Sequence, residues 1–152
     1  IETVKKLRWT PDIILCSGWL SALAPLYLKR VFNDEPFFAH SKIVLMLDDN
    51  EYERPFPTRF TEKLRIEGIT NTDVRGIDGF PVGYEELMRL AVDFSDAIVY
   101  ATPKVNQRVA NYVETKGKPI LPFEQTETPV EASKRLWDFC QTILAKETEE
   151  NE

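Results

Sequence analysis

The sequence has little of the material on which most catalytic centres depend. It contains one histidine, His40, and two cysteines, Cys16 and Cys140, among 152 residues. A single histidine leaves almost nothing for Ser-His-Asp catalysis or for a histidine-based metal site. Two cysteines are too few for a secreted disulfide scaffold, and both are expected to be small core residues. No GxGxxG or Walker sequence is present, so the common nucleotide fingerprints give no support.

Neither a membrane nor nucleic acid is expected as a partner. No stretch resembles a signal peptide, and no apolar run approaches the ~20 residues that a membrane helix needs, so a cytoplasmic protein is the default. The formal net charge is −6 and the sequence pI is about 5.0, whereas a phosphate-binding face needs a basic excess. This composition is compatible with an uncharged polymer such as a glucan, and we expect no cofactor.

The length predicts a single domain over residues 1–152. Hydrophobic residues make up 43% and charged residues 29% of the chain, as in an ordinary folded protein. The opening residues, with Val4 and Leu7, fit the end of a helix and include no initiating methionine, so we expect a piece of a longer protein. Residues 146–152 predict a charged, acidic, solvated tail that closes the polypeptide.

Apolar runs alternate with helical patterns along the chain. Strands are predicted at 13–16, 43–47, 97–101 and 119–123, the first buried on both faces because its four residues are apolar. Every connection is predicted to contain a helix, and Ser21 and Thr102 are expected to cap two of them. This alternation specifies an α/β fold, a Rossmann-like three-layer sandwich with a mainly parallel sheet.

The last predicted helix begins after Thr128 and Pro129. Its residues expected to face the body are Ala132, Leu136, Trp137, Phe139, Cys140, Ile143 and Leu144. Trp9 and Trp137 are expected in the core, whereas for Trp19 core packing and stacking on a sugar ring stay equally open. Asp93 and Asp96 are expected to be solvated.

Residues 51–83 are irregular and rich in Pro, Gly and Asp, with one helix predicted from Thr58 to Ile66. A connection of this length inside a domain is typical of a functional loop or lid. The alternative is that its apolar side chains only pin the loop to the core. Those side chains are Phe56, Phe60, Leu64 and Phe80.

Small and polar residues follow the first two predicted strands. Ser17 and Gly18 come after one strand, and Asp48 and Asp49 come after the next. In open α/β sheets ligands bind beyond the carboxyl ends of the strands, so a site is expected there. The two carboxylates could begin a magnesium or general-base site. Adjacent residues point in opposite directions, however, which favours a capping or loop role and predicts no metal.

The run from Trp9 to Lys29, WTPDIILCSGWLSALAPLYLK, resembles a segment that bacterial glycogen synthases and plant starch synthases write roughly as PDIIHAHDWHTALAPLYLK. The two ends of this run match closely, and Trp19 is kept in the middle. Where the family has histidines and an aspartate, this chain has Leu15, Ser17, Gly18 and Leu20.

Three later segments follow the same order as in those synthases. Residues 42–49 resemble the family's KTVFTIHN strand, with Tyr52 at the position of the tyrosine that follows it. Residues 86–96 resemble FLKAGLYYAD, with Arg89 in place of the lysine, and residues 96–103 resemble ADHITAVSP. The resemblance implies the later part of the acceptor-binding amino-terminal lobe of a two-lobed, Rossmann-like glycosyltransferase. The family's KTGG-type loop and its donor-binding lobe are not in this sequence.

By resemblance the activity would be transfer of glucose from ADP-glucose to an α-1,4-glucan. Ser17 stands where the family has a histidine against the transferred sugar, and Asp48 replaces a second histidine. A serine cannot carry positive charge at neutral pH, so we expect this chain to be inactive alone. The predicted ligand-binding residues lie beyond the strand ends and are Ser17, Gly18, Trp19, Asp48, Asp49, Tyr52, Thr102 and Pro103.

Three functional hypotheses remain open from the sequence. The first is a diverged synthase-like domain that binds an α-glucan or oligosaccharide, or assists a partner. The second is a working synthase subunit completed by a separately encoded donor-binding lobe. The third is an interaction module whose apolar face from Trp19 to Phe32 docks another protein.

Overall fold

Four strands form one parallel sheet whose order, β1-β2-β3-β4, follows the chain. They are β1 (Ile13–Ser17), β2 (Lys42–Leu47), β3 (Ala97–Tyr100) and β4 (Ile120–Leu121). The register places Leu15 beside Val44, Leu45 beside Ile98 and Ile98 beside Ile120. This computed structural model describes residues 2–66, 68–79 and 81–150. All four predicted strands are confirmed, and every connection between them carries a helix.

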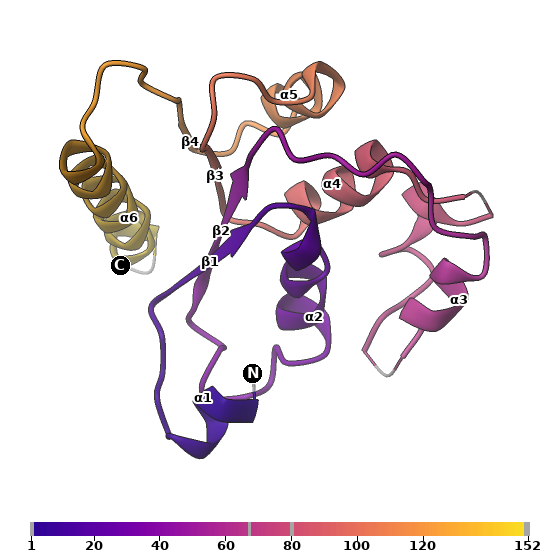
Figure 1. The fold of residues 1–152 in the computed structure, drawn as a ribbon. Coiled ribbons are helices and arrows are strands. Elements are labelled where there is room, and N and C mark those ends of the chain that lie inside the picture. Colours follow the sequence, from indigo (N-terminus) through magenta and orange to yellow (C-terminus); the bar gives the residue numbers. More distant parts are fainter. Residues whose placement is uncertain (1, 67, 80, 151–152) are drawn as a thin grey trace.

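The longer helices are α2 (Ala24–Arg30), α4 (Tyr84–Asp93), α5 (Gln107–Glu114) and α6 (Pro129–Glu150). Shorter ones are α1 (Glu2–Lys6), α3 (Phe60–Leu64) and the 3₁₀ turns η1 (Trp19–Ser21) and η2 (Arg75–Ile77). In Figure 1, α2 and α4 lie on one side of the sheet and α6 lies on the other. The α/β, three-layer prediction is therefore confirmed. Among the described residues no helix has both the length and the apolar character needed to span a membrane.

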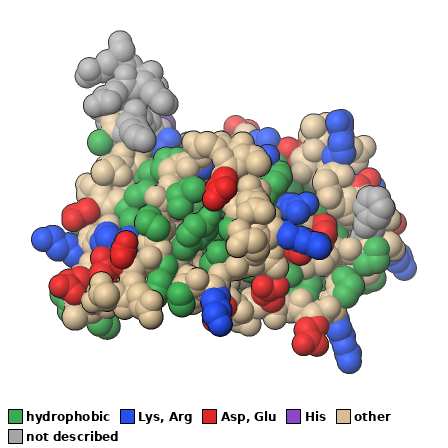
Figure 2. All heavy atoms as spheres, turned by 90° about the horizontal axis from the view of Figure 1, so that it is seen from above, with side chains coloured by type: hydrophobic (Ala, Val, Ile, Leu, Met, Phe, Trp, Pro, Cys, Tyr) green, Lys and Arg blue, Asp and Glu red, His purple; other side chains and the backbone are tan. Residues whose placement is uncertain are grey.

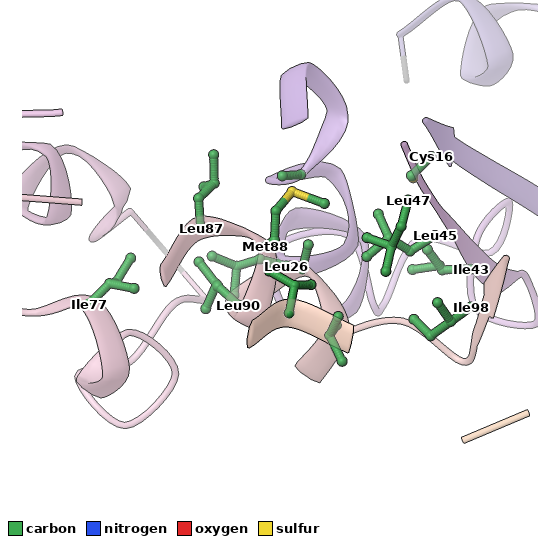
Figure 3. Packing of buried hydrophobic residues seen from close by; sticks show 14 of the residues in the cluster. Cys16, Leu26, Ile43, Leu45, Leu47, Ile77, Leu87, Met88, Leu90 and Ile98 are labelled. Carbon is green, nitrogen blue, oxygen red and sulfur yellow. The ribbon is translucent and has the colours of Figure 1, made fainter. Parts of the chain in front are cut away.

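Two cores follow from the alternation of side chains along the strands. Ile43, Leu45 and Leu47 belong to the larger core, which α2 and α4 cover with Leu26 and Met88. Figure 3 shows these side chains converging from strands and helices. On the opposite face the smaller core joins Val44, Ala97 and Val99 to Ile143 of α6. The sheet is thus buried on both faces at its centre, as its apolar runs require.

The first strand departs from the prediction. It was expected to be buried on both faces, yet Leu15 is 47% exposed. The cause is its place in the sheet, because within the described residues β1 pairs only with β2. A continuous apolar run predicts a buried strand. Whether the strand is buried also depends on whether other elements of the fold pack against both of its faces.

Two tryptophans expected in the core lie at the surface instead. Trp9 is 59% exposed and Trp137 is 65% exposed, and Ala132 is exposed as well. The long helix α6 reaches the sheet along one narrow stripe, through Leu136, Phe139 and Ile143. Trp137 projects beside that stripe, where no described element covers it. Cys140 and Ile143 are buried as predicted.

Both predicted hydroxyl caps are wrong. Ser21 Oγ donates to the carbonyls of Ser17 (2.8 Å) and Gly18 (3.1 Å), and α2 begins three residues later with Pro25 in its first turn. Thr102 Oγ1 donates to the Lys104 carbonyl at 3.0 Å. Asn106 caps α5 instead, because its side-chain oxygen accepts from two amides of the first turn. In each case the hydroxyl donates to a nearby carbonyl and accepts from no amide of the helix, which begins further along the chain.

Asp93 and Asp96 are structural and not merely solvated. The Asp96 carboxylate accepts from the Ile43 amide at 2.7 Å and pairs with Lys29 at 2.8 Å, while the Asp96 amide donates to the Ile43 carbonyl at 2.7 Å. Asp93 accepts from the Tyr112 hydroxyl and pairs with Lys116 at 2.7 Å. Asp96 therefore joins the start of β2, the start of β3 and α2.

The long connection between β2 and α4 is packed, although it is irregular. It contains α3 within the predicted helix, and its buried residues include Leu64, Val74 and Ile77. The buried hydroxyl of Thr61 donates to the Ile77 carbonyl at 3.0 Å. Phe80 lies outside the described residues, as do residues 151–152 of the predicted tail and the side chains of 146–150.

Replacing Asp96 by alanine is predicted to lower the free energy of unfolding by about 2–3 kcal/mol. Most of this loss arises because the Ile43 amide is left without its acceptor. The ion pair with Lys29 is partly solvated and contributes little to stability. Asp96→Asn keeps an acceptor for that amide and should cost only about 1 kcal/mol. Urea unfolding measures both changes. The control is Asp138→Ala, an exposed carboxylate on α6, and equal losses for Asp96→Ala and this control would contradict the assignment.

Candidate functional site

The carboxyl ends of the first three strands meet at one edge of the sheet. Ser17 of β1 lies beside Met46 of β2, and Leu47 of β2 lies beside Tyr100 of β3. The residues that follow each strand therefore emerge close together, at the upper side of Figure 1. Figure 2 looks onto the molecule from above and shows a patch of hydrophobic side chains with acidic and basic groups scattered around it.

Gly18 and Asp48 are in close contact at this edge. Gly18 has φ 62°, a left-handed conformation that favours glycine. A Cβ atom at this position would lie 2.9 Å from Asp48 Oδ2. The other oxygen, Oδ1, accepts from the Asn50 amide at 3.1 Å. The predicted loop role of Asp48 is therefore present, and glycine makes room for its carboxylate.

Trp19, which follows Gly18 in the chain, forms an aromatic pair with Tyr52. Their ring centroids are 5.0 Å apart with planes at 58°. Tyr52 also contacts Phe56 (5.1 Å) and Tyr84 (6.0 Å), and its hydroxyl donates to the Val82 carbonyl at 3.1 Å. Trp19 is half-buried against the larger core. Trp19 therefore has the packing role that the sequence left open, and the residue is still partly accessible to solvent.

The other predicted residues are less closely joined. Ser17 is exposed, and its carbonyl accepts from Ser21. Asp49 and Pro103 are exposed as well. Thr102 follows β3 at the same edge, but its hydroxyl is engaged by the Lys104 carbonyl. Direct contacts therefore unite Gly18 with Asp48 and Trp19 with Tyr52, whereas Thr102 and Pro103 share only the edge.

Sequence reasoning missed three residues here: Glu51, Tyr84 and Asn106. Glu51 Oε2 accepts from the Asn106 side-chain amide at 3.1 Å, which joins the loop after β2 to the start of α5. Tyr84 is 6% exposed and contacts Tyr52. Asn106 could have been identified from the preference of asparagine for helix starts. No local signal points to Tyr84, which lies more than 30 residues from its partner.

The electrostatics of this edge are acidic. Burial, and after it the negative charges of Glu51, Asp48 and Asp49, together raise the pKa of Tyr84 to about 12. The pKa of Tyr52 is also raised, first by burial and then by Glu86 and Tyr84. Both phenols are therefore neutral at physiological pH. No three His, Cys, Asp or Glu side chains within the described part of the chain are grouped to hold a metal ion.

The raised pKa of Tyr84 predicts an alkaline loss of stability. The unfolded chain releases this proton near pH 10, while the folded chain holds it to about pH 12. Stability from this group is therefore complete below pH 10 and lost as the pH rises to 12, by up to roughly 2–3 kcal/mol. Urea unfolding across this range should show a steeper decline for the wild type than for Tyr84→Phe. Identical slopes would contradict the assignment.

Known proteins that resemble this chain are starch and glycogen synthases. The starch synthase catalytic domain family matches residues 1–117, which leaves β4 and α6 outside the match. A glycogen synthase of Chlorobium luteolum is 39% identical over 70 residues, covering 46% of this chain and 14% of that protein. A glycogen synthase of Thermotoga maritima is 30% identical over 110 residues, covering 72% of this chain and 22% of that protein.

The glycogen synthase of Fervidobacterium nodosum is 32% identical over 104 residues, which is 68% of this chain and 21% of that protein. This chain thus spans between about one seventh and one fifth of the length of these relatives. No solved structure matches it significantly. The family match covers well over half of the chain and includes β1 to β3 with the edge described above. The chain belongs to the starch synthase catalytic domain family.

Proposed function

We propose that this chain is a starch synthase-type domain that binds α-glucan at the carboxyl edge of its sheet and does not transfer glucose by itself. The observation that supports it is the Trp19–Tyr52 ring pair, because Trp19 directly follows Gly18, whose backbone lies against the Asp48 carboxylate. The relatives are named glycogen synthases, so a glucan is the polymer that the family handles.

The chemistry of this edge suits a sugar. A pyranose presents an apolar C–H face, which an indole ring covers, and hydroxyl groups, which donate to carboxylates. Asp48 and Asp49 supply acceptor oxygens, and Ser17 adds an exposed hydroxyl. Gly18, which carries no side chain, lets a ligand approach the backbone closely.

The same edge is poorly suited to a sugar nucleotide. Stabilising a departing phosphate requires positive charge or aligned donors. Three carboxylates act on Tyr84 here instead, and they would repel a phosphate. Arg89, which replaces the family's lysine, lies in α4 with its guanidinium 5.4 Å from the Tyr112 ring centroid and 3.9 Å from the Glu85 carboxylate. Binding without transfer is therefore the activity that these residues favour.

A second function keeps catalysis and requires a partner. This hypothesis rests on the family match over residues 1–117 and needs a donor-binding lobe, which these 152 residues do not contain. Incubation with ADP-glucose, glycogen and such a lobe would then incorporate glucose. The chain alone should incorporate none, and turnover by the isolated chain would overturn the proposal of binding without transfer.

Titration with maltoheptaose tests the proposed binding. Chemical-shift changes are expected at residues 17–19, 48–52 and 102–103, with a dissociation constant in the millimolar range. Trp19→Ala should weaken binding at least fivefold, about 1 kcal/mol, and Asp48→Asn should weaken it less, since an amide still offers one acceptor oxygen.

The matched control is Trp137→Ala, which removes an indole from the opposite side of the sheet and should leave the affinity unchanged. Circular dichroism of each variant shows that the fold is kept. Shifts that cluster away from these residues, or none at millimolar sugar, would leave a structural domain as the better interpretation.

A further inference from the structure

The segment around α3 is basic, although the chain as a whole is acidic. Residues 54–66 contain the cations Arg54, Arg59, Lys63 and Arg65 against the single carboxylate Glu62, whereas the whole chain has a formal net charge of −6. At physiological ionic strength the Debye length is about 8 Å. A ligand at α3 therefore meets the local excess of positive charge, which attracts an anion.

Two of these cations line a hollow together with three apolar residues. The hollow has a volume of about 350 Å³, and its lining consists of Phe56, Pro57, Arg59, Phe60 and Lys63. We call it the α3 hollow. No acidic side chain of the described residues lines it. Its volume lies within the range of about 300–1,000 Å³ that is usual for small-molecule sites, whereas a stable protein interface needs roughly 800 Å² from each partner. The hollow therefore fits a small ligand.

The apolar wall of the α3 hollow contains a stacked pair of aromatic rings. The ring centroids of Phe56 and Phe60 are 4.6 Å apart, and the ring planes differ by only 11°. Both residues are half-buried, so each is held by its neighbours and stays partly accessible. Aromatic walls of this kind pack against the flat face of a base or against the C–H face of a sugar. The wall therefore favours a ligand that contains a ring.

This arrangement is fixed before any ligand binds. The backbone of Phe56 exchanges two hydrogen bonds of 2.9 Å with Val82. The buried Thr61 hydroxyl donates to the Ile77 carbonyl at 3.0 Å, and Leu64 is also buried, so the inner side of α3 is anchored. A ligand would not have to order these elements, which lowers the cost of binding.

Arg59 and Lys63 lie one helical turn apart. Arg59 immediately precedes α3 with helical dihedral angles, φ −68° and ψ −5°, so the two residues are neighbours on the helix surface. Like charges at this spacing repel each other. Glu62 lies 3.5 Å from Arg59, but the two side chains are 63% and 83% exposed, and such a pair is weak. An anion that contacts both cations would relieve their repulsion.

We propose that the α3 hollow binds a small phosphate monoester that carries a ring, either a nucleoside monophosphate or a sugar phosphate. Its phosphate accepts hydrogen bonds from Arg59 and Lys63, because guanidinium and ammonium groups are the usual phosphate donors of proteins. Its ring packs against Phe56 and Phe60. A phosphate monoester carries a charge of about −1.5 to −2 at pH 7, which matches the two cations.

The α3 hollow is separate from the carboxyl edge of the sheet. In Figure 1, α3 lies well to the right of the strands. Phe56 contacts Tyr52, but none of the residues predicted to bind a ligand at the edge lines the hollow. The inference therefore does not depend on the proposed binding of α-glucan, and maltoheptaose carries no phosphate.

Titration of the intact 152-residue protein with adenosine monophosphate and with glucose 1-phosphate tests the proposal. At least one of them should saturate with a dissociation constant of about 1 mM or lower, and the amide chemical-shift changes should cluster at residues 56–63. Tighter binding of the first identifies a nucleoside phosphate, and tighter binding of the second identifies a sugar phosphate. Adenosine, glucose and inorganic phosphate, which each lack one half of the ligand, should bind at least tenfold more weakly.

Substitutions separate the two halves of the site. Arg59→Gln and Lys63→Gln, both at exposed positions, should each weaken binding at least threefold. The matched control is Lys134→Gln, which removes the same charge from an exposed position on α6 and should leave the affinity unchanged. Phe60→Leu keeps an apolar side chain without a ring and should reduce the affinity to that of inorganic phosphate. Circular dichroism of each variant shows that the fold is kept.

Four results would overturn the proposal. They are binding of neither phosphate monoester, shifts centred away from residues 56–63, equal losses of affinity in Lys63→Gln and Lys134→Gln, and equal affinity for inorganic phosphate and the monoesters. Each result is obtained without maltoheptaose, so failure of this proposal and failure of α-glucan binding are told apart.

Discussion

A reciprocal contact between Asp96 and Ile43 sets the alignment on which the rest of the sheet depends. The Asp96 amide donates to the Ile43 carbonyl, and the Asp96 carboxylate accepts from the Ile43 amide. The starts of β2 and β3 are thereby fixed in one register, which carries Leu47 beside Tyr100 at the other end. Because the carboxylate also holds Lys29, α2 is tied to the same point. One side chain at the base of the sheet thus positions the loops at its top.

The sequence was sufficient for the fold because its signals are local. Apolar runs bounded by polar residues define each strand, and alternation with helices defines a parallel sheet. Burial is different, since it depends on neighbours distant in sequence. Leu15 and Trp137 are hydrophobic like Leu45 and Ile143, but their neighbours among the described residues leave them 47% and 65% exposed. Helix starts were missed for a different, local reason, because the hydroxyls of Ser21 and Thr102 donate to carbonyls within four residues and this competes with capping.

The candidate site could be predicted in outline only. Parallel strands bring Ser17, Asp48 and Thr102 to one edge by topology alone. The side-chain contacts at this edge join residues that are far apart in the sequence, such as Tyr52 with Tyr84 and Glu51 with Asn106. The family resemblance shows at which positions this chain carries a residue different from that of the synthases. The structure shows that three carboxylates make the surroundings of Tyr84 acidic.

The two ends of the long connection between β2 and α4 are hydrogen-bonded to each other. The Val82 carbonyl accepts from both the Phe56 amide and the Tyr52 hydroxyl, and Val82 donates back to Phe56. Since the two ends of the segment are held there, the entropy of closing it changes only slowly with the number of residues inside. Insertions or deletions beyond this neck would alter the outline of the molecule near α3 and leave the strand register intact. The segment between Phe56 and Val82 can therefore change in length while the sheet stays the same.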